Sequence, residues 1–221
     1  MNEKQWATER WNAQYMVHTL GDLRLPRTKA GRRKLRLYAC GCCRGVWDML
    51  PDDRLRRAVE VAERFADGEV DKAKLAAAEK RIEPLNADGY FPRLPIGVAR
   101  AVSMVVAACG QSAYNAALVM TALLPTPLAA GAKGDRMLCD LLRCVFGNPF
   151  RKPVFPKKWR SETVTALAAG IYADRAFDRL PILADALEEA GCDNTELLVH
   201  LRGDGPHCRG CWPLDLALGK G

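Results

Sequence analysis

The chain has 221 residues, of which 49% are hydrophobic and 27% charged, and its formal net charge is +7. These proportions are those of a globular protein and exclude a disordered chain, and the length is enough to bury an ordinary core. Residues 1–11 carry charges of both signs and no apolar run, so we expect no secretory signal and a cytoplasmic protein.

Helical periodicity recurs along the chain, and no segment alternates strongly between apolar and polar residues. Asp52, Asp71, Ser161 and Asn194 are predicted N-caps, because their side chains can accept a hydrogen bond from the first turn of a helix. The predicted helices, in chain order, run from Lys4 to Leu20 with a possible break near Asn12, from Arg33 to Leu50, from Asp52 to Gly68, from Asp71 to just before Pro84, from Ile96 to Leu124 with a possible bend near Gly110, from Asp135 to Phe146, from Ser161 to about Asp174, from Leu180 to Ala190, from Thr195 to Arg202 and from Trp212 to Leu218.

The predicted fold class is therefore all-α, an irregular array of helices joined by loops rich in Pro, Gly and aromatic residues. We expect one domain over residues 1–221, with a possible sub-boundary in the loop at 86–95, and no sheet beyond a two-stranded pair in the irregular segments. The stretch from Ala101 to Ala132 contains no charged residue and is long enough to span a bilayer. It carries Gln111, Ser112 and Asn115 at its centre, so we interpret it as a buried core helix and predict no contact with a membrane.

The positive charge is concentrated in two stretches that contain no acidic residue. Twelve of the 33 basic residues lie there, so the rest of the chain has more acidic than basic side chains. Concentrated cations attract phosphate, and the second stretch interleaves them with Phe150, Phe155 and Trp159, which can stack on bases or anchor the loop. The predicted nucleic-acid-binding residues are Arg32, Arg33, Lys34, Lys157, Lys158 and Arg160. Solvated loops, or a face for an acidic protein partner, are the alternatives.

Two cysteine-rich groups are the candidates for chemistry. Cys40, Cys42 and Cys43 form the first, and His207, Cys208 and Cys211 form the second; each contains a C-x-x-C spacing, which can present two sulfurs to one zinc ion. Buried structural cysteines and a reactive or redox thiol pair are the alternatives. An odd total of nine cysteines argues against a disulfide framework. We assign Cys109, Cys139, Cys144 and Cys192 to core packing.

Catalytic motifs are mostly absent from the sequence. The second cysteine group is similar to the P-C-x-x-C half of a zinc deaminase, but the chain has no H-x-E or C-x-E half. It also lacks H-E-x-x-H, a Gly-rich phosphate loop and G-x-S-x-G. His18 and His200 lie in amphipathic helices and are interpreted as surface or core residues, while a nucleophile pair of Cys211 with His200 or His207 stays open.

Three stretches carry a resemblance to a known family: residues 33–47 (RKLRLYACGCCRGVW) with 57–68, residues 146–151 (FGNPFR), and residues 171–187 continuing to Cys211-Trp212 and 218–220. On these the chain resembles a family of uncharacterised bacterial proteins, expanded in planctomycetes and also found in actinobacteria. Members usually have a cysteine at the position of Leu201 and an apolar residue at that of Cys208. The resemblance implies Cys40, Cys43, His207 and Cys211 as the metal-binding set, and it implies no activity. Some members bear names from a toxin-immunity superfamily with an α/β fold, which the helical pattern does not support.

These observations predict a non-enzymatic interaction module that a structural zinc ion can stabilise and that contacts protein or nucleic acid through its basic loops. The alternative is a metal- or thiol-dependent enzyme built on the Cys/His cluster. A closed site with four protein ligands favours the module, whereas an open coordination position favours the enzyme.

Overall fold

The computed structural model describes residues 1–86, 95–123 and 132–220. In these residues the chain forms twelve α-helices and five short 3-10 helices, and no β-strand, which confirms the predicted all-α class. The α-helices are α1 (Glu3–Thr8), α2 (Ala13–Asp22), α3 (Lys29–Arg44), α4 (Asp53–Ala66), α5 (Lys72–Ile82), α6 (Ile96–Cys109), α7 (Ala113–Leu123), α8 (Ala132–Phe146), α9 (Glu162–Asp174), α10 (Leu180–Glu189), α11 (Thr195–Arg202) and α12 (Trp212–Leu218). The 3-10 helices cover Leu25–Arg27, Trp47–Met49, Glu83–Asn86, Lys157–Trp159 and Phe177–Arg179.

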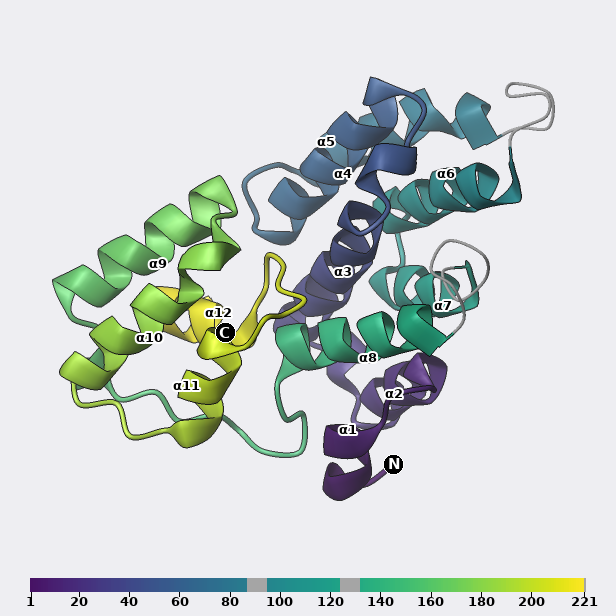
Figure 1. Cartoon of the computed structure of the whole chain (residues 1–221). Coiled ribbons are helices and arrows are strands. Elements are labelled where there is room, and N and C mark those ends of the chain that lie inside the picture. Colours follow the sequence, from purple (N-terminus) through teal and green to yellow (C-terminus); the bar gives the residue numbers. More distant parts are fainter. Residues whose placement is uncertain (87–94, 124–131, 221) are drawn as a thin grey trace.

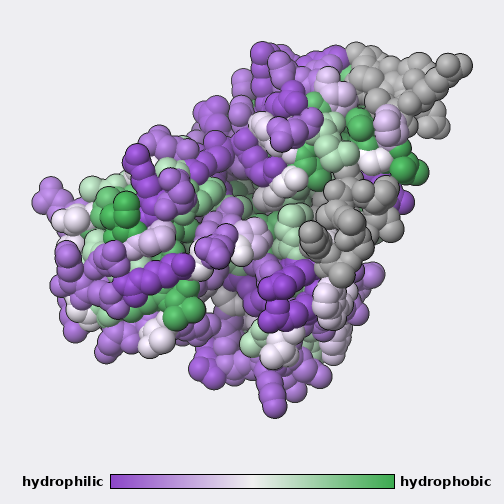
Figure 2. Space-filling view, in the orientation of Figure 1, coloured by the Kyte–Doolittle hydropathy of each residue, from purple (hydrophilic) through white to green (hydrophobic). Residues whose placement is uncertain are grey.

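The long helix α3 runs through the middle of the molecule (Figure 1) and packs against α4, α6, α7 and α8. Ten of its sixteen residues are buried, so it forms the centre of the core. Helices α9 to α12 gather on one side of α3, and α12 links this group to the rest by packing against both α9 and α8 (Figure 1). Polar side chains dominate the face shown in Figure 2, with apolar side chains in separate spots over the α9–α11 region and beside α6.

The helices begin where the capping residues predict. Asp52, Asp71, Ser161 and Asn194 each accept a hydrogen bond from a backbone N–H in the first turn of α4, α5, α9 and α11. Asn12 does the same for α2, so the predicted helix over residues 4–20 is two helices that meet at this cap. The capping chemistry of single residues therefore sets the start of these five helices.

The uncharged segment forms two helices, α6 and α7, separated at Gly110 by an extended residue. Arg36 of α3 donates hydrogen bonds to the carbonyls of Ala108 and Gln111, which lie at this break. No helix in the described part of the chain is both long and apolar enough to cross a membrane. Most of the predicted boundary loop, residues 87–94, and the proline-containing end of the segment, residues 124–131, lie outside the described residues.

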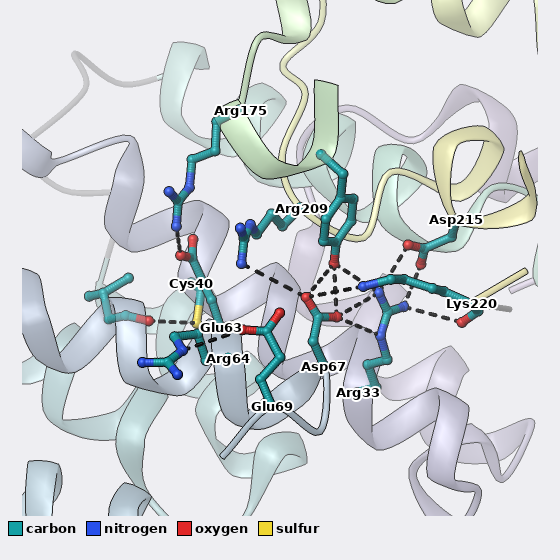
Figure 3. Close-up of polar contacts among 12 residues, drawn as sticks. Arg33, Cys40, Glu63, Arg64, Asp67, Glu69, Arg175, Arg209, Asp215 and Lys220 are labelled. Atoms are coloured by element: carbon teal, nitrogen blue, oxygen red, sulfur yellow. Dashed lines mark hydrogen bonds and ion pairs between the residues drawn. The ribbon is translucent and has the colours of Figure 1, made fainter. Parts of the chain in front are cut away.

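Buried ion pairs join the two groups of helices. The carboxylate of Asp67, which follows α4, is fully buried and lies at the centre of cationic groups of Arg33, Arg209 and Lys220 (Figure 3). It also accepts hydrogen bonds from the Tyr172 hydroxyl of α9.

A second carboxylate, that of Glu63 in α4, pairs with Arg44 of α3 and with Arg175 at the end of α9 (Figure 3). Charges removed from water must be paired, so these contacts fix α9 and the C-terminus against α3 and α4.

Candidate metal centre

Four potential ligand atoms from α8 and from the C-terminal segment at 200–211 converge beside α12. They belong to Cys144 of α8, His200 of α11, His207 in the loop that follows α11, and Cys211, which directly precedes α12; all lie within 4.8 Å of one another. The Cys144 Sγ is 3.8 Å from His207 Nδ1, and the Cys211 Sγ is 3.4 Å from His200 Nε2. Zn–S bonds of about 2.3 Å and Zn–N bonds of about 2.0–2.1 Å place tetrahedral sulfur and nitrogen ligands about 3.5 Å apart. The cluster thus has close to the dimensions of a tetrahedral zinc site.

Local backbone features bring the four side chains together. The ring of Trp212, at the start of α12, packs on Gly147, at the end of α8: a Cβ on this glycine would lie 3.0 Å from the ring. Gly147 has φ +59°, in the region that glycine adopts most easily, and its carbonyl accepts a hydrogen bond from the Trp6 indole at 2.8 Å. This close approach holds Cys144 beside Cys211.

The orientation of His207 is fixed by a hydrogen bond outside the cluster. Its Nε2 lies 2.9 Å from the Gly203 carbonyl oxygen, which can only accept, so the proton is on Nε2. The lone pair of Nδ1 then points toward Cys144, the arrangement in which an imidazole ligates a metal. The two imidazoles lie edge to face, with ring centroids 5.1 Å apart.

The cysteines of the cluster are almost completely buried, whereas the two histidines are half-buried. Hydrogen bonds from Cys208 and Cys211 lower the pKa of the Cys144 thiol well below its usual value. Burial, together with the neighbouring Cys144, raises the pKa of Cys211. Burial opposes protonation of His207, but its contact with Cys144 outweighs this and raises the pKa of the imidazole. The neighbouring thiols and imidazoles thus favour the ionised form of Cys144, the form in which a cysteine binds a metal.

Two residues of the predicted metal-binding set, His207 and Cys211, lie in this cluster, and the other two do not. Cys40 and Cys43 lie on the face of α3 that packs on α4; the Cys40 Sγ is 4.0 Å from the Val59 carbonyl oxygen. Burial raises the pKa of both thiols well above the usual value. All three cysteines of the first group are buried in the core.

The two cysteine groups nevertheless meet, through a glycine. Gly41, one residue on from Cys40, faces the loop before α12: a Cβ there would lie 3.0 Å from the Cys208 Sγ. Successive helix residues point about 100° apart, so a face that receives the loop cannot also direct Cys40 and Cys43 to it. Gly210 has φ +87° and packs on Leu37 in the same way. The first group thus packs against the loop that carries Cys208, while Cys40 and Cys43 lie outside the cluster.

The other two residues of the cluster are Cys144 and His200. From the sequence, Cys144 was predicted to pack in the core, and His200 was interpreted as a surface or core residue of an amphipathic helix. The spacing His200-x6-His207-x3-Cys211 is the one sequence signal for His200, and it was interpreted only as a nucleophile pair of Cys211 with His200 or His207. Cys144 lies 56 positions before His200, and nothing in its local sequence marks it as a ligand.

The predicted nucleic-acid-binding residues divide into two sets. Arg33 is bound to Asp67 and Asp215, and burial lowers the pKa of Lys34, whose ammonium lies 5.9 Å from the centroid of the Phe146 ring. Arg160 donates to the Leu216 carbonyl at the end of α12. In contrast, Arg32, Lys157 and Lys158 are exposed.

A comparison of the chain with protein-family models, with curated proteins and with solved structures gives no match. The case for a function therefore rests on the residues and their geometry.

Proposed function

We propose that this protein is a non-enzymatic, helical interaction module stapled by one structural zinc ion, which Cys144, His200, His207 and Cys211 bind. The observation that carries the proposal is the convergence of two sulfurs and two imidazole nitrogens within 4.8 Å, from residues far apart in the sequence. Two thiolates and two imidazoles in a tetrahedron are a typical zinc donor set, while calcium and magnesium prefer oxygen ligands.

A structural role fits the site better than a catalytic one. Four protein ligands complete a tetrahedron, whereas catalytic zinc sites keep one position for water or substrate. Cys144, the one thiol with a lowered pKa, is 1% exposed, so a substrate has no route to it as a nucleophile. The site also lies where a cross-link is useful, because it ties α8 to the α11–α12 segment.

The proposed interaction surface consists of exposed basic side chains. Arg32, Lys157 and Lys158 remain available to a polyanionic partner, since they are exposed and none forms an ion pair with another described residue. A nucleic-acid partner requires binding that weakens steeply with salt, with a log–log slope near −0.9 per neutralised phosphate on duplex DNA. Anisotropy titrations with a labelled duplex at two or more salt concentrations measure this slope. Undetectable binding at low salt, or binding unchanged in Lys157→Ala/Lys158→Ala, removes nucleic acid from the proposal.

The metal is tested by elemental analysis of the purified protein, followed by replacement with cobalt(II). We expect one zinc per chain and, after replacement, the intense visible absorption of tetrahedral cobalt with thiolate ligands. The spectrum should not change on addition of azide or cyanide, because a closed site has no position for them. A spectrum that shifts with either anion indicates an open position and supports the alternative, a metal-dependent enzyme. Absence of bound zinc or cobalt refutes the proposed structural metal site.

A further inference from the structure

A cavity of about 780 Å³ lies apart from the candidate metal cluster. Its walls are the start of α3, the end of α4, the start of α5, the connection between α6 and α7, and residues 219–220 of the C-terminus. Pockets for small molecules and cofactors usually occupy about 300–1,000 Å³, so this cavity has the size of a ligand site. None of the four proposed zinc ligands lines it.

The cavity wall has an excess of positive charge. Six basic side chains and two acidic ones line it: Lys29, Arg32, Arg33, Arg36, Lys72 and Lys220 against Asp67 and Glu79. Asp67 is already paired with Arg33 and Lys220, which form one edge of the cavity (Figure 3). Such a wall with low-dielectric surroundings concentrates anions.

Three of the cations have no acidic partner. Lys29, Arg32 and Lys72 are exposed, and none forms an ion pair with any residue that the structure describes. Arg32 makes one hydrogen bond, from its guanidinium to the Arg27 carbonyl at 2.7 Å. Lys29 and Lys72 are the first residues of α3 and α5, so the two ammonium groups come from separate helices to one cavity.

Arg36 adds a buried charge to the wall. The residue is only 3% exposed, and its guanidinium donates to the carbonyls of Ala108 and Gln111 and lies 5.2 Å from the centroid of the Phe65 ring. Within the described residues no carboxylate lies within ion-pair distance of it. Burial lowers its pKa, which reflects a cost of keeping it charged that a bound anion would offset.

The rest of the wall is apolar. Phe65, Val70 and Leu75 line it together with alanines of α4, α5 and α7. Four surplus positive charges suit a ligand with two or three linked phosphate groups, because its terminal phosphate carries about −1.5 to −2 charges and each inner phosphate about −1, which totals roughly −3 to −4. We propose that this cavity binds a small organic di- or triphosphate, with the phosphates between Lys29, Arg32 and Lys72 and the organic part against Phe65 and its apolar neighbours.

Isothermal titration calorimetry with ADP tests the proposal on the full-length, metal-loaded protein. We expect saturable binding of one ADP per chain with a dissociation constant below about 1 mM, competition by inorganic pyrophosphate, and no binding of adenosine. Lys29→Ala/Lys72→Ala should weaken ADP binding at least about tenfold, since a hydrogen bond to a charged group is worth at least that factor. Lys74→Ala/Lys80→Ala is the matched control, because it removes the same two charges from exposed positions of α5 outside the cavity, and it should change the affinity less than about twofold.

Three results would overturn the proposal: no heat of binding with ADP up to several times the expected dissociation constant, an equal loss of affinity in both double variants, or equally tight binding of adenosine. Tighter binding of a short single-stranded oligonucleotide than of ADP, lost in the Lys29/Lys72 variant, would also overturn it and reassign the cavity to nucleic acid. Circular dichroism of each variant shows whether the fold is retained. The result is independent of the metal proposal, whose failure would appear as absence of bound zinc.

Discussion

Replacing one cysteine of the metal centre separates ligation from packing. Cys144→Ala removes a proposed ligand, and Cys43→Ala removes an equally buried cysteine that belongs to the sequence-predicted set but lies outside the cluster. The two variants delete the same atom from the same protein core. Their difference in metal dependence therefore reports ligation alone.

The expected gain in stability on zinc binding follows from the length of the chain segment that the metal closes into a loop. Cys144 and His200 bound to one ion close a loop of about 57 residues, and a cross-link of that length restricts the unfolded chain by about 4 kcal/mol in the chain-entropy account. In a domain of this size 1 kcal/mol shifts Tm by about 2–4 °C, so zinc should raise Tm by about 8–16 °C.

The assay is thermal unfolding followed by circular dichroism, with zinc added or with zinc removed by a chelator. Cys43→Ala should lower Tm in both conditions by a similar amount, because a core cysteine lost to a small cavity costs the same with or without metal. It should keep the full zinc-dependent increment. Cys144→Ala should lose most of that increment. A full increment in Cys144→Ala together with its loss in Cys43→Ala would refute the assignment of ligands.

Three further perturbations test the fold and the site. Asp67→Asn should destabilise the protein by about 3 kcal/mol in urea unfolding, because Arg209 and Lys220 lose their carboxylate and Arg33 keeps only Asp215; a change below about 1 kcal/mol would contradict the role given to this residue. Gly147→Ala should cost more stability than Gly68→Ala and should weaken cobalt binding, since both glycines have positive φ but only the first packs on the Trp212 ring; equal costs and equal cobalt affinities would show that this contact is unimportant. Cobalt affinity, measured by direct titration, should rise with pH between about 5.5 and 8, because the cluster contains an imidazole and a thiol with raised pKa values that must lose their protons to bind; an affinity independent of pH would contradict this.

The helices were predictable because their signals are local. An Asp, Ser or Asn side chain caps the helix that follows it with no help from the rest of the fold, so Asp52, Asp71, Ser161 and Asn194 marked four helix starts. The end of α3 was less clear, since the predicted helix ran to Leu50 while α3 ends at Arg44 and a 3-10 helix covers Trp47–Met49. Here the chain changes direction without a proline to mark the end of the helix.

The candidate metal cluster was only half predictable because its four residues come together through tertiary packing. His207 and Cys211 are four residues apart in one loop, so a local motif contains both. Cys144 comes from a distant helix, and it reaches the loop only because Gly147 allows Trp212 to approach. The C-x-x-C spacing of Cys40 and Cys43 predicted a pair of metal ligands, but tertiary packing leaves these two cysteines outside the cluster. Those sulfurs belong to a helix whose neighbouring face, at Gly41, receives the loop.

X-ray absorption at the zinc edge tests the central claim most directly. On the zinc-loaded protein the account predicts two sulfur neighbours at about 2.3 Å and two nitrogen neighbours at about 2.0–2.1 Å, with no further oxygen ligand. In Cys144→Ala one sulfur should be lost, and in Cys43→Ala the shell should be unchanged. Three or four sulfurs in the wild-type shell, a water ligand in place of one imidazole, or loss of a sulfur in Cys43→Ala would contradict it.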